Sequence, residues 1–481
     1  MSETMLTVIL ALVKCVFSLA FVMQIVPLLI WAERKGAAYI QDRPGPNRAH
    51  ILGVRAGGLI HTLPDVFKLI TKEDVVPSHV FRPLWALAPI ISMSVALVTF
   101  SVVPWGDQIL IPAEIAEKYL GTTGPLAVNL QVADIDGGLL YVLAMTSLGV
   151  YGIMLAGWSS NNKFSLIGGL RSAAQMVSYE LAMGMGVVAM FMTYGTTRLD
   201  TIMQIQSESI LNWGVLLSPP VGLVAFILFW VSAFAECNRN PFDLPEGEAE
   251  LVAGYHTEYS SLRFALFFMA EYANMVVASS VTATLFFGGY NIPFVNGAML
   301  REHIDLVLIA IGVGGGVFFL FAASIAFGRR KDPFYAAMEA FKGPRPNKLA
   351  PVGGLNGLLY RALHDDTLRQ HEWKIFTAIW AGAAAAHFGL IGLGAMNIAS
   401  GMPLLTEIIV FVTQLNAFVV KVLFGCWMFI WVRWTLPRFR YDQLMDLGWK
   451  YMLPIGLVNI LLAAVWLLID ANTMRLYAAI P

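Results

Sequence analysis

Two long apolar runs flank a charged stretch in the middle of the chain. Residues 215–235 read VLLSPPVGLVAFILFWVSAFA, and residues 264–287 read FALFFMAEYANMVVASSVTATLFF. Apolar segments of about 20 residues are long enough to cross a bilayer as helices. The stretch that joins them, FAECNRNPFDLPEGEAELVAGYHTEY at 234–259, contains six carboxylates and one arginine. The pattern predicts two membrane-spanning helices connected by an acidic loop.

The composition extends this interpretation to the whole chain. Of the 481 residues, 57% are hydrophobic and only 13% are charged, and the mean hydropathy is positive. Such a chain lacks enough polar surface to be soluble, so we expect an integral membrane protein in a lipid bilayer. The formal net charge of −1 favours neither nucleic acid nor a generally acidic substrate, and we expect no nucleic acid partner.

Apolar stretches of sufficient length occur ten times, which predicts an all-α polytopic membrane protein with about ten transmembrane helices. They cover approximately residues 5–31, 84–104, 139–157, 172–193, 215–235, 264–287, 304–327, 375–396, 408–432 and 452–469. With the N-terminus outside, 25 of the 31 lysines and arginines fall inside, four fall outside and two lie within spans. The positive-inside rule therefore predicts that both termini lie on the outer side.

The N-terminus and the cysteines exclude several classes. Glu3 precedes the first apolar run and Arg34 and Lys35 follow it, which is the reverse of a cleavable signal peptide. The three cysteines form no CxxC pair and no cluster with histidine at metal-ligand spacing. We therefore expect a retained first span, and no iron–sulfur cluster, zinc site or disulfide framework.

Two inside loops are longer than simple connections require. In the first, at 33–83, a helical repeat of apolar residues beside charges predicts an amphipathic interfacial helix at about 53–72. The repeat consists of Leu59, Leu63, Val66, Phe67 and Ile70. The second loop, at 328–374, is rich in turn-forming and basic residues, which predicts a cytoplasmic excursion without a core of its own.

Two glutamates lie inside predicted spans. A carboxylate near the bilayer centre costs about 2.5–3.5 kcal/mol, so such residues usually face a protein interior or water. Glu180 lies in a helix where Ala174, Ser178, Ala182 and Gly186 form a small-residue face. Glu271 has Asn274 one turn further on. Each glutamate can be a neutral packing residue, but two of them beside an acidic loop favour a functional role.

The acidic loop itself has a structural interpretation and a functional one. Asp243 and Glu246 have the spacing of a capping box, and glutamates in a first helical turn complement the helix dipole. That interpretation does not explain Glu236 at the end of a span or Glu258 just before the next one. Closely spaced carboxylates in a poorly hydrated site repel one another and titrate as a coupled set, which Arg239 could keep partly ionised.

Six stretches occur in an order that identifies a family. They are ERKGAAYIQDRPGPNR, KLITKED, GGLRSAAQMVSYE, AECNRNPFDLPEGEAELVAGYHTEY, FALFFMAEYAN and RWTLPRFRYDQLMDLGWKYMLP. Together they resemble the H-type membrane component of bacterial NADH:quinone oxidoreductase, the counterpart of mitochondrial NADH dehydrogenase subunit 1 in respiratory complex I. The resemblance covers 1–290, as a membrane core of six spans with the acidic loop at 236–263, and 405–481, as two further spans.

The resemblance implies a non-redox membrane subunit of an H⁺-translocating NADH:quinone oxidoreductase in the bacterial inner membrane. It implies that the chain forms the membrane wall of a quinone chamber and starts the acidic relay that couples quinone reduction to proton pumping. Quinone is then the substrate, and NADH, FMN and iron–sulfur clusters are expected in partner subunits. The implied partners are peripheral quinone-site subunits and antiporter-like membrane subunits.

The resemblance also implies roles for individual residues. The quinone side takes Glu33, Arg34, Asp65, Arg433, Arg438 and Asp442. The proton relay takes Glu180, Glu236, Arg239, Asp243, Glu246, Glu248, Glu250, Glu258 and Glu271. The basic residues have an alternative role, because the positive-inside rule also places Arg34, Lys35, Arg438 and Arg440 on the inner side as membrane anchors.

The sequence departs from the family pattern in two places. His61, Thr62 and Pro64 replace the usual residues of the interfacial helix, which puts the role of Asp65 in doubt. Residues 291–404 form an expected insertion with two extra spans and the basic loop. Small residues at four-residue spacing in GVGGGVFF and AGAAAAHFG predict that these spans pack on each other or on a neighbour, with His387 as a packing residue.

Two other functions remain open from the sequence. The related subunit of a membrane-bound hydrogenase, or of a dehydrogenase with another donor, resembles this family over much of its length. A stand-alone proton-coupled transporter would also carry acids within its spans. The basic quinone-side motifs favour the quinone enzyme, and the long inside loops disfavour the transporter.

Overall fold

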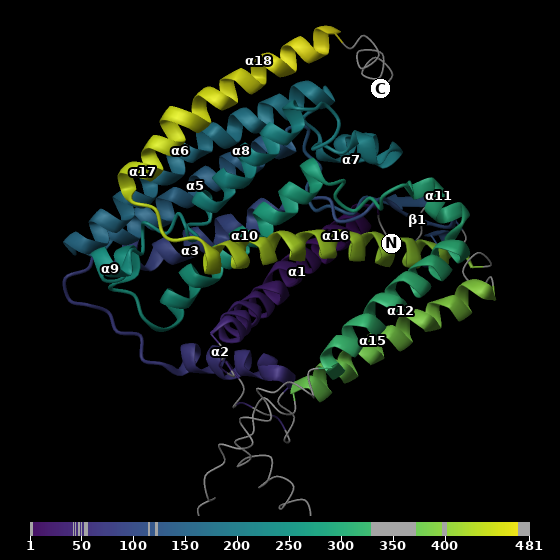
Figure 1. Ribbon diagram of the computed structural model, residues 1–481, viewed down its shortest axis with the longest axis horizontal. Coiled ribbons are helices and arrows are strands. Elements are labelled where there is room, and N and C mark those ends of the chain that lie inside the picture. Colours follow the sequence, from purple (N-terminus) through teal and green to yellow (C-terminus); the bar gives the residue numbers. More distant parts are fainter. Residues whose placement is uncertain are drawn as a thin grey trace, which may run out of the picture. The chain divides into compact units, whose positions relative to one another are not determined.

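The computed structural model describes residues 3–41, 43, 45–46, 49, 51, 56–113, 116–120, 124–328, 372–396 and 402–469. Helices make up most of this part of the chain (Figure 1). Two compact units are present. The first comprises Met1–Val26, Leu69–Leu300 and Glu407–Pro481, and the second comprises Pro27–Lys68 and Arg301–Thr406.

Ten apolar helices coincide with the ten predicted spans. They are α1 (Glu3–Ile40), α3 (Arg82–Thr99), α5 (Gly138–Ser159), α6 (Lys163–Tyr194), α8 (Val221–Glu236), α10 (Ser261–Phe286), α12 (Ile304–Gly328), α15 (Glu372–Ala395), α16 (Pro403–Thr435) and α18 (Leu453–Ile469). Within the described residues, eight are long and apolar enough to cross a membrane, while α8 and the apolar part of α15 are shorter. The all-α polytopic fold is confirmed.

Short elements connect these helices. They are η1 (Ala56–His61), α2 (Thr62–Thr71), η2 (Phe100–Val102), β1 (Ile109–Ile111), η3 (Ala116–Leu120), β2 (Leu126–Val128), α7 (Leu199–Glu208), η4 (Ile210–Asn212), α9 (Glu248–Leu251), η5 (Gly254–His256), α11 (Gly297–Glu302), α17 (Tyr441–Asp446) and η7 (Leu447–Met452). Strands β1 and β2 pair antiparallel, with Leu110 opposite Ala127. Outside this hairpin, the described chain is organised by helix packing.

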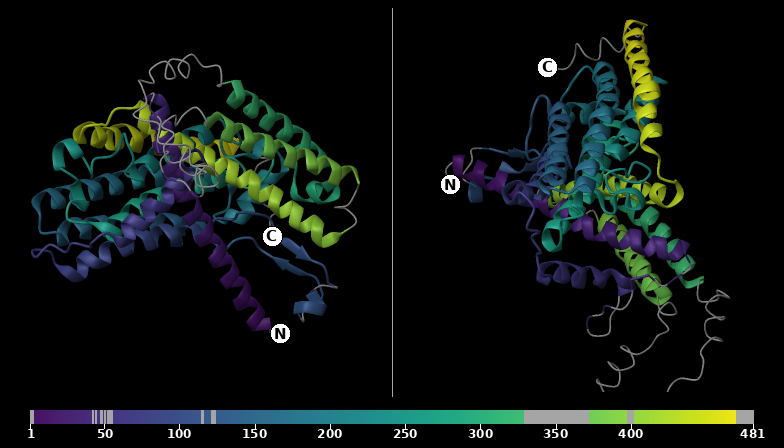
Figure 2. Two further views of the ribbon diagram at one scale, coloured as in Figure 1. Left: turned by 90° about the horizontal axis from the view of Figure 1, so that it is seen from below. Right: turned by 90° about the vertical axis from the view of Figure 1, so that its left-hand side faces the viewer.

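Helix α6 is the centre of the first unit. It packs against α5, α8 and α18, while α3 packs against α5 and α10, and these neighbours stay side by side in both turned views (Figure 2). The predicted small-residue face is confirmed, because Ser178 and Ala182 are buried and a Cβ on Gly186 would lie 3.0 Å from the carbonyl oxygen of Ala225 in α8. Close backbone approach thus sets the α6–α8 contact.

The first inside loop is shorter than predicted. Helix α1 continues to Ile40, so Glu33 and Arg34 are helical rather than part of a loop. The interfacial helix is α2, which begins at Thr62 and not near residue 53. Gly57 and Gly58 precede it with positive φ angles of 62° and 90°, which an α-helix cannot include. Its apolar residues Leu63, Val66, Phe67 and Ile70 are exposed in this chain, as expected of a helix at a membrane interface.

The second unit contains the packed pair α12 and α15. A Cβ on Gly312 would lie 2.7 Å from the carbonyl oxygen of His387, so the small residues allow close contact and the predicted pairing is confirmed. The Nδ1 atom of His387 lies 2.8 Å from the Ala383 carbonyl oxygen, and its ring packs 4.8 Å from that of Phe319. These contacts are those of a packing residue. The predicted basic loop falls almost entirely at 329–371, outside the described residues.

Candidate functional site

The acidic loop is a buried segment and not a solvated connection. Helix α8 ends at Glu236, which is 7% exposed, and Asn238, Arg239 and Asp243 are each buried as well. Gln175 of α6 donates from Nε2 to the Ala235 carbonyl oxygen at 2.8 Å and to Asn238 Oδ1 at 3.2 Å. The amide thus satisfies a carbonyl that the helix end leaves without an intrahelical partner. Helix α6 thereby fixes the direction in which the chain leaves α8.

The predicted capping box is wrong. Helix α9 begins at Glu248, its N-cap is Gly247 with a left-handed backbone, and no side chain caps it. Asp243 instead binds Arg438, whose Nη2 lies 2.5 Å from Asp243 Oδ2. A tertiary ion pair has therefore taken the carboxylate that the local pattern assigned to a helix end.

The Asp243–Arg438 pair belongs to a wider contact between the acidic loop and the segment after α16. Asn240 donates from Nδ2 to the Leu436 carbonyl oxygen at 2.7 Å, and the Phe439 amide donates to the Pro241 carbonyl oxygen at 3.0 Å. Burial raises the pKa of Asp243 to about 6, Glu246 adds to the rise, and Arg438 opposes it. The structure thus joins a residue predicted for the quinone side to one predicted for the proton relay.

Glu271 is connected to the loop by a tyrosine. Glu271 lies on α10 and is 8% exposed, and Tyr255 of η5 donates its hydroxyl to Glu271 Oε1 at 3.1 Å. Burial, followed by the nearby Glu271 carboxyl, raises the pKa of Tyr255 well above its ordinary value, so the phenol is a proton donor. Tyr255 was not predicted as a site residue. The only sequence signal was its position in the family stretch GYHTEY.

Arg239 lies on the other side of the same region. It is 4% exposed, and its guanidinium carbon is 4.0 Å from the ring centroid of Tyr272, the residue after Glu271. A guanidinium over an aromatic face is attracted by the ring quadrupole, and more strongly when both groups are removed from water. The predicted positive charge of the acidic set is therefore buried beside the helix that carries Glu271.

The remaining loop acids lie nearer the surface and have basic or amide partners. Glu246 Oε1 lies 3.6 Å from His256 Nδ1, and Glu250 accepts from Arg171 at 2.6 Å. Glu258 accepts from Asn162 Nδ2 at 2.7 Å, with His79 Nε2 at 3.6 Å. Glu248 lies in α9, but its side chain is outside the described part. These glutamates form a rim around the buried acids.

Glu180 has its own partner inside the bundle. The hydroxyl of Ser147 on α5 donates to Glu180 Oε1. Serine is common in apolar helices, so the sequence did not single out Ser147. Glu180 is thus a hydrogen-bonded glutamate on α6, as both interpretations of the sequence allowed.

The predicted quinone-side residues fall into two groups. In the second unit, Arg34 pairs with Asp65, Trp31 Nε1 donates to the Gly57 carbonyl oxygen at 3.2 Å, and Glu33 is 9% exposed. In the first unit, Arg438 binds Asp243, and Asp442 accepts from Arg440 Nη2 at 2.5 Å. The backbone carbonyl of Arg433 accepts from Asn240 Nδ2 at 3.3 Å. Whether these residues meet a quinone stays a prediction.

Metal ligation has no support in the described chain. Those residues contain no group of three or more His, Cys, Asp or Glu side chains that could hold a metal ion. The three cysteines, Cys15, Cys237 and Cys426, are free.

The fold and this site define a polytopic membrane protein with buried carboxylates at the end of its helices. The family model for NADH dehydrogenase matches residues 13–334 and 374–464, and the chain belongs to this family. A relative from Solibacter usitatus, an H-type component of NADH-quinone oxidoreductase by its name, is 40% identical over 94% of this chain and 96% of its own length.

Other relatives agree with this assignment. The protein of the same name from Leptospira biflexa is 39% identical over 90% of this chain and 88% of its own length. NADH-quinone oxidoreductase subunit 8 from Rhodothermus marinus is 37% identical over 91% of each chain. The resemblance inferred from the sequence is thus confirmed, and with it the expected connection to NADH, quinone and electron transport in a membrane.

The family match bears on the expected insertion at 291–404. The matched ranges include α12 and nearly all of α15, and the unmatched interval at 335–373 lies between these two helices. The division of the chain at residues 291 and 404 stays a prediction.

Proposed function

We propose that this chain is the part of a proton-pumping NADH:quinone oxidoreductase that forms the membrane wall of the quinone chamber and starts the proton relay. Glu33, Arg34, Asp65, Arg433, Arg438 and Asp442 face the quinone in this proposal. Reduction to the quinol takes two electrons from a cluster in a peripheral subunit and two protons. The acidic set responds by taking up or shifting protons toward antiporter-like partner subunits.

The ion pair between Arg438 and Asp243 carries this proposal. Arg438 belongs to the basic segment proposed for the quinone side, and Asp243 is a buried carboxylate of the loop. Its pKa of about 6 lies near physiological pH, so a change of one nearby charge is enough to change its protonation. A negative charge appearing near Arg438 would compete for the guanidinium and raise the pKa of Asp243 further.

A path from this pair into the membrane follows from the neighbouring contacts. Glu246 is near enough to Asp243 to raise its pKa. Both Glu246 and Asp243 also act on Tyr255, which donates to Glu271 within α10. Glu236 and the Ser147-bonded Glu180 are further proton sites on α8 and α6. Because a phenol can donate and accept, Tyr255 can pass a proton between the loop acids and Glu271.

The alternatives make different predictions. A hydrogenase-type complex would work with ferredoxin and hydrogen, and a transporter would be active alone in liposomes. The names of the relatives favour the quinone enzyme. We therefore place the chain in the bacterial inner membrane with both termini outside. NADH, FMN and iron–sulfur clusters belong to partner subunits in this proposal.

Double-mutant analysis of Asp243→Asn and Arg438→Gln in the purified complex tests the proposal. Each variant should lower quinone-dependent NADH oxidation at least about tenfold, and the double variant should lower it little further, because the residues act as a unit. NADH oxidation with a water-soluble acceptor, which needs only the peripheral arm, controls for assembly. Independent additive effects, or normal quinone reduction in both single variants, would contradict the proposed role.

A further inference from the structure

The start of α10 is bound to the end of the interfacial helix α2 by side chains that no role has yet explained. The hydroxyl of Ser261 lies 2.8 Å from the Leu69 carbonyl oxygen and 2.9 Å from that of Lys72. Ser260 Oγ accepts from the Val75 amide at 3.1 Å. The last carbonyls of a helix have no intrahelical partner. Ser261 therefore caps the C-terminus of α2 from a position almost 200 residues away.

The backbone at Ser261 indicates that this contact is under constraint. Ser261 has a φ of 54° and is 4% exposed. A left-handed conformation in a residue other than glycine costs on the order of 1 kcal/mol and persists only where the surroundings enforce it. The strain therefore lies at the residue that joins the two helices.

A second attachment lies close by, at the start of α10. Arg263 Nη1 lies 3.0 Å from Asp74 Oδ2, just after α2. The same guanidinium lies 4.2 Å from the ring of Trp85 on α3, and Trp85 stacks on Tyr259 at 5.0 Å. Tyr259 also donates its hydroxyl to the Trp85 carbonyl oxygen at 3.1 Å. These contacts tie the end of α2, α3 and the last residues of the acidic loop to one point.

This junction lies between the two members of the hydrogen bond that leads into the membrane. Tyr255 precedes Ser261 by six residues, and Glu271 follows it by ten, or about 15 Å along a helix. A helix transmits an axial displacement along its length because its backbone hydrogen bonds make it stiff. A shift of the start of α10 therefore changes the position of Glu271 relative to Tyr255.

We propose that Ser261, supported by the Asp74–Arg263 pair, is a positioning residue that ties α10 to the interfacial helix and so keeps Glu271 in register with Tyr255. Displacement of the end of α2 then reaches Glu271 through Ser261. On the other side, Asp65 lies one helical turn before Leu69 in α2. This inference rests on the proposed relay function of Glu271.

Substitution of Ser261 separates positioning from stability. Ser261→Gly removes the hydroxyl but relieves the positive φ, so the complex should assemble with near-normal thermal stability. Ser261→Ala removes the hydroxyl and keeps the strain, so it should be less stable. Both should lower the turnover of quinone reduction about threefold, as expected for one lost hydrogen bond, and lower the proton-to-electron ratio in vesicles. The KM for quinone should stay within about twofold, because Ser261 acts on Glu271 and not on quinone binding.

The chain offers a matched control in the same helix. Ser280 is fully buried on α10, and its hydroxyl donates only within the helix, to the Val276 carbonyl oxygen at 2.7 Å. Ser280→Ala should leave turnover and the proton-to-electron ratio unchanged. Normal turnover and pumping in Ser261→Gly would overturn the proposal.

Charge reversal tests the second attachment if the Ser261 variants fail to assemble. Asp74→Lys and Arg263→Glu should each lower the proton-to-electron ratio, and the double variant should restore it in part. Restoration stays partial because glutamate cannot stack on Trp85. The reversal of Asp446 and Lys450, a pair 2.7 Å apart at i, i+4, is the control and should have no effect. Absence of any rescue in the double variant would overturn the role of the pair.

The failure of this inference can be told from that of the relay. If Glu271→Gln lowers pumping but the Ser261 and Arg263 variants do not, only the positioning role fails. If Glu271→Gln pumps normally, the relay fails first.

Discussion

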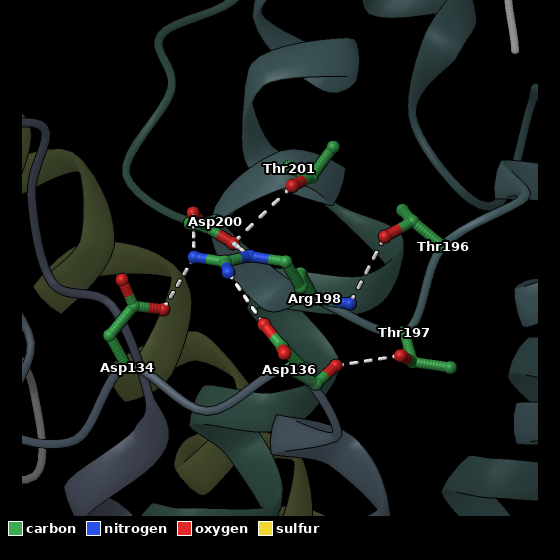
Figure 3. A network of polar contacts seen from close by, with 7 residues as sticks. All are labelled: Asp134, Asp136, Thr196, Thr197, Arg198, Asp200 and Thr201. Atoms are coloured by element: carbon green, nitrogen blue, oxygen red, sulfur yellow. Dashed lines mark hydrogen bonds and ion pairs between the residues drawn. The ribbon is translucent and has the colours of Figure 1, made fainter. Parts of the chain in front are cut away.

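Two groups of carboxylates in this protein each meet an arginine, and their acids shift in opposite directions. Around Arg198, at the start of α7, Asp134, Asp136 and Asp200 accept from one guanidinium at 2.8, 2.6 and 3.0 Å (Figure 3). Burial alone raises the pKa of Asp200, but the hydrogen bonds from Arg198 and Thr201 outweigh it, and the pKa lies below its ordinary value. Around Arg438, the pKa of Asp243 rises to about 6.

The difference comes from burial and from the neighbouring charges. The Asp243 side chain is 11% exposed, whereas those of Asp200 and Asp136 are 32% and 89% exposed. Asp243 also has Glu246 nearby, so one arginine meets two carboxylates in a poorly hydrated place. Threonines support the Arg198 group, since the Arg198 amide donates to Thr196 Oγ1 and Thr197 donates to the Asp136 carbonyl oxygen. An exposed, well-bonded group stabilises structure, and a buried one is available for proton exchange.

Glu271→Gln should have the largest effect. It keeps the side-chain volume and an acceptor for Tyr255 but removes the exchangeable proton. Proton carriers contribute on the order of a hundredfold or more to rates, so coupled quinone reduction should fall at least about tenfold. Quinone-dependent NADH oxidation and proton uptake into vesicles measure it, with Asp136→Asn as a matched control. Equal activity of the two variants would remove the distinction between the groups.

The titration of Asp243 should be visible in the pH dependence. Quinone reduction that requires the ionised carboxylate should fall as pH drops through about 6, and Asp243→Asn should abolish that inflection. The stability effect has the reverse sign. The raised pKa means that ionisation of Asp243 costs the folded state about 1–3 kcal/mol above pH 6, relative to an ordinary aspartate.

Thermal stability of the complex at pH 5 and pH 8 measures that cost. Asp243→Asn should not lower stability at pH 8, even though it removes an ion pair. A clear loss of stability at pH 8, together with an unchanged pH profile of activity, would show that Asp243 is a structural residue.

Asp200→Asn should have a smaller effect, and on stability alone. The lowered pKa of Asp200 contributes stability that is present above the ordinary aspartate pKa of 3.8 and is lost as pH falls through the lower folded-state value. The variant should therefore be less stable than the parent at neutral pH, by about 1 kcal/mol for a partly exposed pair, and equal to it in acid. Thermal stability checks this, and a changed proton-to-electron ratio would be unexpected.

The smallest effect should come from the rim. Glu250 pairs with Arg171 at 2.6 Å, but its side chain is 57% exposed. Such a pair contributes about 0–1 kcal/mol, so Glu250→Gln should change neither thermal stability nor turnover by more than about twofold. A loss of turnover as large as that of Glu271→Gln would place the proton entry at the rim.

The sequence predicted those parts of the molecule that depend on hydropathy and on rare residues. All ten spans coincide with helices, and Glu236 and Glu271 stood out because a carboxylate is rare in an apolar run. Tyr255 and Ser147 were missed because tyrosine and serine are ordinary residues in such places. The partner of Asp243 could not be predicted either. Arg438 is 195 residues away, so only the tertiary fold decides between it and a local helix cap.

The first loop shows the same limit. The apolar repeat placed an interfacial helix correctly, but not its start, because Gly57 and Gly58 adopt positive φ angles that a periodicity argument does not consider. Likewise, nothing in the order SSLR indicates that Ser261 reaches back to the end of α2. Contacts between distant segments determine both the buried acids and the junction that positions them.

Infrared difference spectroscopy of the intact complex, recorded on quinone reduction, tests the central claim most directly. The buried acids should change protonation, which gives difference bands in the carboxylic acid region. We predict that Asp243→Asn and Glu271→Gln each remove part of these bands, whereas Asp200→Asn leaves them unchanged. Bands that persist in both variants of the buried group would contradict the claim that these carboxylates exchange protons when the quinone is reduced.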